Sequence, residues 1–283
     1  MSQLPTVRDE IDRFLRTGSH DAQSGAWPGS FLSREQDAAR DLRSALITEV
    51  RNRSFGRRTL PNPVDVDFTA MTRQKIAPMV LGLFPESERD LVQKLLERST
   101  VVVTAANIDQ IIESANWLYT AWALANLYLG SIGAELLGPD APSIVGLSEE
   151  TRCYLSTDYW SDSDRFADFL VHETAHAFHN CKRTTAGLRE TRRREWLLDI
   201  DFGKRETFAY ACEAYSRLIE LSSAKADRRK LFAELLDHET PPDDRVDADE
   251  YMAILREAVE ARNGWKRILA RCSPFETSSK MTA

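Results

Sequence analysis

The residues of this sequence with the clearest chemical potential are His172, Glu173 and His176, in the order His-Glu-Thr-Ala-His. Two residues four apart on an α-helix lie on the same face, with Cβ atoms about 5–6 Å apart, so both imidazoles could reach one metal ion. Glu173 lies about 100° further round the helix than His172, where it would flank the ion rather than bind it. This arrangement is typical of zinc sites in which the glutamate takes a proton from water activated by the metal.

The pattern can work only on a helix, and the surrounding residues predict one from Arg165 to Lys182. No proline or glycine interrupts this run, and the segment 162–164, Asp-Ser-Asp, offers N-cap side chains. Apolar residues recur at helical spacing, at Phe166, Phe169, Leu170 and Phe178. An amphipathic helix with two incidental histidines is the alternative interpretation, but the spacing and the placement of the glutamate favour a metal site.

A catalytic zinc site uses three protein ligands and leaves one position for water, so a third ligand must come from elsewhere in the chain. His179 lies on the same helix as the histidine pair, and we expect it to support the site rather than bind the ion. Glu206 and Glu213 share a helix predicted over residues 203–222 and lie about 10.5 Å apart along its axis, so only one can bind a given ion. The candidates after the motif are His179, Glu190, Glu195, Glu206, Glu213, Glu220 and His238.

From about residue 164 to residue 222 the sequence resembles the glutamate-zincin metallopeptidases, in which His-Glu-x-x-His is followed by a ligand glutamate on a second helix. That superfamily includes thermolysin-like enzymes, zinc aminopeptidases and the repressor-cleaving peptidases of phage and stress-response systems. The segment Glu206-Thr207-Phe208-Ala209 is similar to the aminopeptidase segment that opens with the third ligand. The interval from His176 to Glu206, 206 − 176 = 30 residues, is similar to that of the repressor-cleaving group.

The resemblance implies that His172, His176 and Glu206 bind Zn²⁺ and that Glu173 is the general base in hydrolysis of a peptide or protein substrate. Glu213 is the alternative third ligand and would otherwise bond to a ligand histidine or to the substrate. A further donor should stabilise the oxyanion, and the candidates are Tyr210, Tyr215 and His238. The alternative function is that of a zinc-binding protein of the zincin fold that regulates or binds partners without peptidase activity.

The composition is that of a large globular protein, with 283 residues, 42% of them hydrophobic and 29% charged. A net charge of −7 argues against bulk binding to nucleic acid. Because the first ten residues lack the apolar core of a signal peptide, we expect a cytoplasmic protein. A reducing compartment also suits the four cysteines, which are widely spaced and form no Cys-x-x-Cys pair: Cys153, Cys181, Cys212 and Cys272.

One uncharged segment, from Ser114 to Ala134, is about as long as a membrane span. It contains Asn116 and Asn126, and it is bounded by Glu113 and Glu135 rather than by lysine or arginine anchors. We therefore expect a buried helix there and no association with a membrane.

The overall pattern predicts an α+β fold that is predominantly helical, with a small antiparallel sheet. Pro61 and Pro63 suggest a division into a helical N-terminal region, residues 1–60, and a zincin-like metallopeptidase domain with C-terminal helices, residues 61–283. Helices are expected over residues 85–98, 107–129, 203–222, 225–238 and 246–272. Strands are expected over residues 100–104, 143–147 and 152–156, the last two as a hairpin.

Overall fold

The structure is a computed structural model that describes residues 5–57, 67–141, 143–161, 164–191, 194–222, 224–237, 241 and 243–274. The chain divides into two compact units, each built from segments that are separate in sequence. The first unit contains Met1–Asp65, Val102–Glu149 and Tyr154–Ser161, and the second contains Val66–Val101, Glu150–Cys153 and Asp162–Ala283. The boundary predicted between residues 60 and 61 lies outside the described residues.

The fold is predominantly helical with one small sheet, as the α+β prediction required. Its strands are β1 (Thr100–Val102), β2 (Gly146–Glu149) and β3 (Arg152–Leu155), in the order β1-β3-β2. The hairpin of β2 and β3 turns at Glu150, which has a φ of 51°. The sheet is mixed rather than antiparallel, so that part of the prediction is wrong. The long connection over residues 103–145 allows β1 to run parallel to β3, which a short turn could not do.

The first unit is helical around α6 (Leu118–Ser131), which is buried along almost its whole length. The helix predicted over residues 107–129 is in fact two helices, α5 (Ile108–Ser114) and α6. The break is stabilised by a residue distant in sequence: the Glu149 carboxylate accepts hydrogen bonds from the backbone amides of Asn116 and Trp117, at 3.1 and 3.3 Å, and caps α6. Among the described residues, no helix combines the length and apolar character needed to cross a bilayer.

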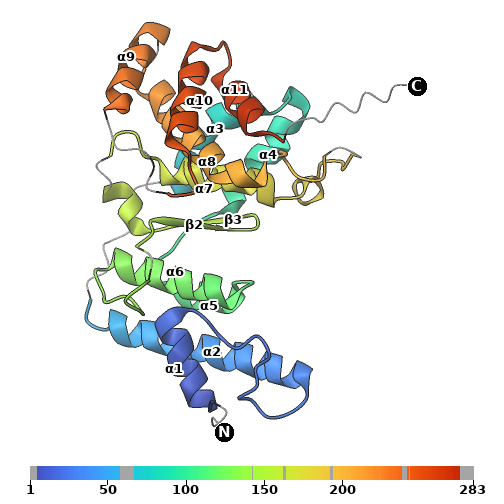
Figure 1. Cartoon of the computed structure of the whole chain (residues 1–283), viewed down its shortest axis with the longest axis vertical. Coiled ribbons are helices and arrows are strands. Elements are labelled where there is room, and N and C mark those ends of the chain that lie inside the picture. The colour runs from blue at the N-terminus through green and yellow to red at the C-terminus, as the bar shows by residue number, and fades with distance from the viewer. Residues whose placement is uncertain are drawn as a thin grey trace. The chain divides into compact units, whose positions relative to one another are not determined.

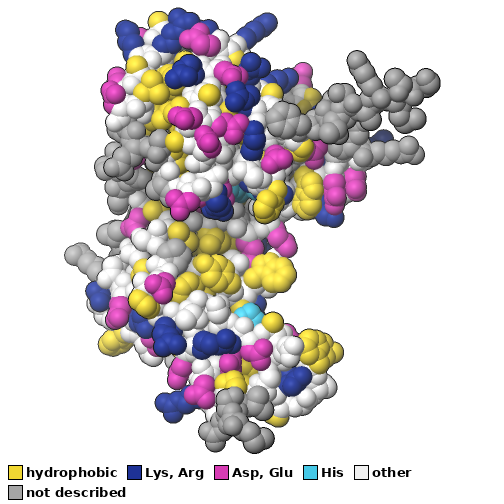
Figure 2. Space-filling view, viewed as in Figure 1, with side chains coloured by type: hydrophobic (Ala, Val, Ile, Leu, Met, Phe, Trp, Pro, Cys, Tyr) yellow, Lys and Arg dark blue, Asp and Glu magenta, His cyan; other side chains and the backbone are white. Residues whose placement is uncertain are grey.

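The remaining helices of the first unit are α1 (Val7–Thr17) and α2 (Phe31–Ser54), and a 3₁₀ turn, η1, spans Thr157–Ser161. The second unit contains α3 (Phe68–Leu83), α4 (Glu86–Ser99), α7 (Phe169–Asn180), α8 (Arg205–Glu220), α9 (Lys225–Leu236), α10 (Ala248–Glu260) and α11 (Gly264–Cys272), with 3₁₀ turns η2 (Arg183–Ala186) and η3 (Phe202–Lys204). In this unit α7 packs along α8 and against α3 (Figure 1). Over α9 and α10, Lys and Arg side chains are interspersed with Asp and Glu on the visible face (Figure 2).

The single helix predicted over residues 246–272 is divided into α10 and α11. The division is made by Asn263, whose side chain accepts from the amide of Lys266 as the N-cap of α11 and donates to the carbonyl of Gly82 at 2.9 Å. A side chain that bonds to two backbone groups favours a helix start over a helix interior.

The helix that carries the histidine pair, α7, is buried within the second unit. Every residue from Leu170 to His179 is buried, so this helix is enclosed on all sides. It begins later than the sequence suggests: Asp164 makes a turn by accepting from the amide of Phe166, and Asp168 is the N-cap, accepting from the amide of Val171. Residues 162 and 163 of the predicted cap lie outside the described residues.

Candidate metal centre

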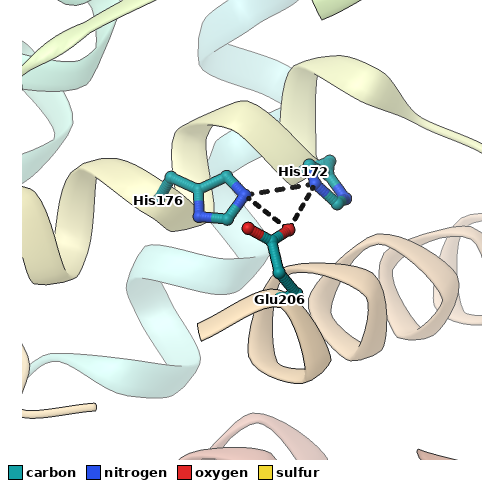
Figure 3. Close-up of side chains that lie close together, drawn as sticks. All are labelled: His172, His176 and Glu206. Atoms are coloured by element: carbon teal, nitrogen blue, oxygen red, sulfur yellow. Dashed lines mark hydrogen bonds and ion pairs between the residues drawn. The ribbon is translucent and has the colours of Figure 1, made fainter. Parts of the chain in front are cut away.

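His172, His176 and Glu206 come together between α7 and α8, with their polar atoms facing one point (Figure 3). The two histidine Nε2 atoms lie 3.2 Å apart. Oε2 of Glu206 lies 3.4 Å from Nε2 of His176 and 3.8 Å from Nε2 of His172. Both helices carry small side chains that are fully buried, Ala175 on α7 and Ala209 on α8.

The spacing of these three atoms suits a metal ion. Ligands held tetrahedrally at about 2.0–2.1 Å from a zinc ion lie about 3.3 Å from one another, and the observed separations are close to that value. The donor set of two imidazoles and one carboxylate is also one that zinc accepts. The cluster touches solvent, because 10% of the His176 side chain and 17% of the Glu206 side chain are exposed. Water could therefore reach the point that the three atoms face.

The outer nitrogen of His172, Nδ1, which faces away from the cluster, is held by Glu213. Nδ1 of His172 lies 3.0 Å from Oε2 of Glu213, whose other oxygen accepts from the backbone amide of Asp168 at 2.7 Å. Burial opposes a charge on His172, but the hydrogen bond and the charge of Glu213 outweigh it and raise the pKa of His172 to about 9. In the metal-free protein a protonated His172 can then donate from Nε2 to Nε2 of His176.

The outer nitrogen of His176 is held by a second histidine. Nδ1 of His176 lies 3.1 Å from Nε2 of His179, and Nδ1 of His179 lies 3.0 Å from Oδ1 of Asn180. Burial, together with the neighbouring His176, lowers the pKa of His179 to about 3, so this ring is neutral. His179 therefore lies behind His176, in contact with the nitrogen that faces away from the cluster.

The outer oxygen of Glu206 is held by Arg245, which the sequence analysis did not identify. Nη1 of Arg245 lies 2.9 Å from Oε1 of Glu206, and the same guanidinium pairs with Asp243. Burial acts to raise the pKa of Glu206, but its close neighbours His176, Arg245 and His172 outweigh it and lower that pKa. No local pattern could have indicated Arg245, because it lies in the loop that precedes α10.

The proposed general base and one of the proposed donors lie beside the cluster. The charge of Glu173 is among those that raise the pKa of His172, and its backbone carbonyl accepts from the Cys153 thiol of β3 at 3.2 Å. The ring of Tyr210 stands edge-on to the His172 ring with centroids 4.4 Å apart. Burial and the nearby carboxylates raise the pKa of Tyr210 to about 12, so the hydroxyl keeps its proton at neutral pH.

The other candidates from the sequence lie elsewhere. Tyr215 is buried against Trp265, with ring centroids 5.0 Å apart. Glu195 pairs with Lys182, and Glu220 pairs with Lys75 and Arg217, whereas Glu190 is exposed. His238 lies outside the described residues. Of the two glutamates on α8, Glu206 therefore faces the Nε2 atoms of both histidines and Glu213 faces Nδ1 of His172.

No protein-family description, curated protein or solved structure matches this chain.

Proposed function

We propose that this protein is a zinc-dependent metallopeptidase whose ligands are His172, His176 and Glu206. The main support is the way in which each candidate ligand is held. One polar atom of each faces the common point, and its other polar atom is fixed by a separate partner, Glu213, His179 or Arg245. Ligands that are oriented from behind in this manner are typical of metal sites, and a chance pair of histidines would not require it.

The proposed mechanism is hydrolysis by an activated water. Zinc, when bound, would supply a Lewis acid that lowers the pKa of water towards about 7. Glu173 would accept the proton from the attacking water and pass it to the leaving amine. The Tyr210 hydroxyl, which keeps its proton, would donate to the oxygen on which negative charge develops.

A peptide or protein is the proposed substrate because of the resemblance of residues 164–222 to the glutamate zincins. The proposed compartment is the cytoplasm, and all four cysteines are buried and free, which suits reducing conditions. The alternative, a zinc-holding regulatory protein, uses the same ligands but needs no role for Glu173.

The decisive experiment compares the wild type with Glu173→Gln and His172→Ala, all full length. The zinc content of each protein is measured by elemental analysis. Its hydrolytic activity is measured on a broad peptide library. The wild type should hold about one zinc ion per chain and cleave some of the peptides. Glu173→Gln should hold as much zinc but lose activity by at least about 100-fold, and His172→Ala should lose both.

A matched control is Glu195→Gln, which removes an exposed partner of Lys182 and should change neither zinc content nor activity. If the wild type and Glu173→Gln both hold zinc and neither cleaves any peptide, the result would falsify the peptidase proposal and favour the regulatory alternative. Absence of stoichiometric zinc in the wild type would contradict both.

A further inference from the structure

We infer that Asn180, acting through His179, fixes the tautomer of His176 so that its inward-facing nitrogen carries a lone pair rather than a proton. His179 and Asn180 are thus positioning residues for a proposed ligand, and their role in zinc binding rests on the proposed function. The arrangement of protons along the three side chains can be measured whether or not zinc binds.

The three side chains form a continuous chain of hydrogen bonds at the C-terminal end of α7. Nδ1 of His176 and Nε2 of His179 are 3.1 Å apart, and Nδ1 of His179 and Oδ1 of Asn180 are 3.0 Å apart. His179 is only 3% exposed, so water has little access to replace these partners. The inward-facing nitrogen of His176 makes the contacts with His172 and Glu206, and its second nitrogen is directed away from them (Figure 3).

The direction of the hydrogen bonds follows from which groups can donate. A carbonyl oxygen only accepts, so Nδ1 of His179 must carry a proton to bond with Asn180. In the neutral ring Nε2 of His179 then has a lone pair and must accept. Nδ1 of His176 is therefore the donor, which leaves the lone pair of His176 on Nε2, the nitrogen that faces the metal position.

The acceptor behind His176 differs from the one behind His172. A metal-binding histidine commonly donates to a carboxylate, a backbone carbonyl or water, and Glu213 gives His172 a carboxylate. His179 gives His176 a neutral ring that could hold its proton on either nitrogen. Such a ring orients its neighbour only if a further group fixes its own tautomer, and Asn180 occupies the position to do so.

Removing the Asn180 oxygen should therefore change the position of the proton on His176, although the two side chains are linked only through His179. In Asn180→Leu, His179 is free to carry its proton on Nε2, where it would donate to Nδ1 of His176. His176 would then hold its own proton on Nε2, which blocks the inward-facing nitrogen. Asn180→Asp keeps a carbonyl-type oxygen at the same position and should preserve the wild-type arrangement.

The test uses full-length protein with ¹⁵N-labelled histidine, before and after treatment with a chelator. Long-range ¹H–¹⁵N correlation spectra report which imidazole nitrogen carries the proton, and zinc affinity is measured by competition with a chromophoric chelator. His176→Gln and His179→Gln assign the signals. A matched control is Asn52→Leu, which replaces an exposed asparagine on α2.

We expect Nδ1–H tautomers for both His176 and His179 in the wild type, in Asn180→Asp and in Asn52→Leu. Asn180→Leu should show a new Nε2–H signal and bind zinc roughly 10- to 100-fold more weakly. An Nε2–H tautomer of either histidine in the metal-free wild type would overturn the inference, as would Asn180→Leu with unchanged tautomers and zinc affinity. Wild-type protein with the expected tautomers but no affinity for zinc would support this inference and overturn the proposed function.

Discussion

Nζ of Lys75 on α3 lies 2.9 Å from Oδ2 of Asp168, the N-cap residue of α7. The Asp168 side chain is 1% exposed and the Lys75 side chain 19%, so this ion pair is largely shielded from water. Asp168 also donates its backbone amide to Glu213, which holds His172. A single lysine therefore helps to fix the start of the helix that carries the histidine pair.

Lys75→Met should destabilise the protein strongly, because it leaves a buried carboxylate without its counter-charge. Breaking such a pair from one side costs about 3–5 kcal/mol, and urea unfolding of the metal-free protein would measure it. The control is Lys94→Met on α4, whose ion pair with Asp90 is exposed on both sides and is worth about 0–1 kcal/mol. Equal losses for the two variants would contradict a special role for Lys75.

Zinc affinity should depend steeply on pH, because zinc must displace the Nε2 proton of His172. Glu213 stabilises the protonated ring through its contact with Nδ1. With the pKa of His172 raised to about 9, affinity should rise with increasing pH and level off near that value. Each pH unit below it should cost about tenfold in affinity from this one proton. Chelator competition from pH 6 to pH 10 would measure the profile.

Glu213→Gln is the matched variant for this profile, since it keeps the shape of the side chain and removes the charge. Its profile should level off nearer the ordinary histidine pKa of 6.5. In the metal-free wild type the folded-state pKa is raised, so the stabilisation from this pair should be complete below pH 6.5 and lost as pH rises through about 9. A profile that Glu213→Gln leaves unchanged would show that Glu213 does not hold the proton.

Arg245→Ala should weaken zinc binding by about tenfold or more, because the outer oxygen of Glu206 loses the partner that orients it. Arg245→Lys should recover part of the loss by restoring the charge without the shape of the guanidinium. Titration with zinc and a competing chelator would measure both variants. Arg229→Ala, which removes an exposed partner of Glu260, is the control and should bind zinc normally.

Tyr210→Phe should reduce the turnover number by about 100- to 1,000-fold while zinc content is unchanged, as expected for loss of a donor to the developing oxyanion. With the pKa of Tyr210 raised to about 12, the wild-type rate should show no decline near pH 10 from this residue. Steady-state kinetics on the best peptide from the library would test both points. Tyr215→Phe is the comparison, since Tyr215 packs against Trp265.

The sequence alone was sufficient for the features that depend on local spacing. A separation of four residues puts two histidines on one face of any helix, so the pairing of His172 and His176 follows from the chain itself. The position of α8 and the preference for Glu206 came from periodicity and from a resemblance over a short segment. The helical character of the fold was predictable for the same reason, because the spacing of apolar residues that marks a helix can be recognised within a short stretch of sequence.

Only the tertiary structure decided the features that depend on residues distant in sequence. It separated the roles of Glu206 and Glu213, because the packing of α8 on α7 determines which carboxylate meets which nitrogen. It divided the helix predicted over residues 107–129, because Glu149 on β2 supplies the carboxylate that caps α6. It also placed Arg245 against Glu206 and Lys75 against Asp168. Neither contact could be predicted from the sequence, because each joins residues that are far apart in the chain.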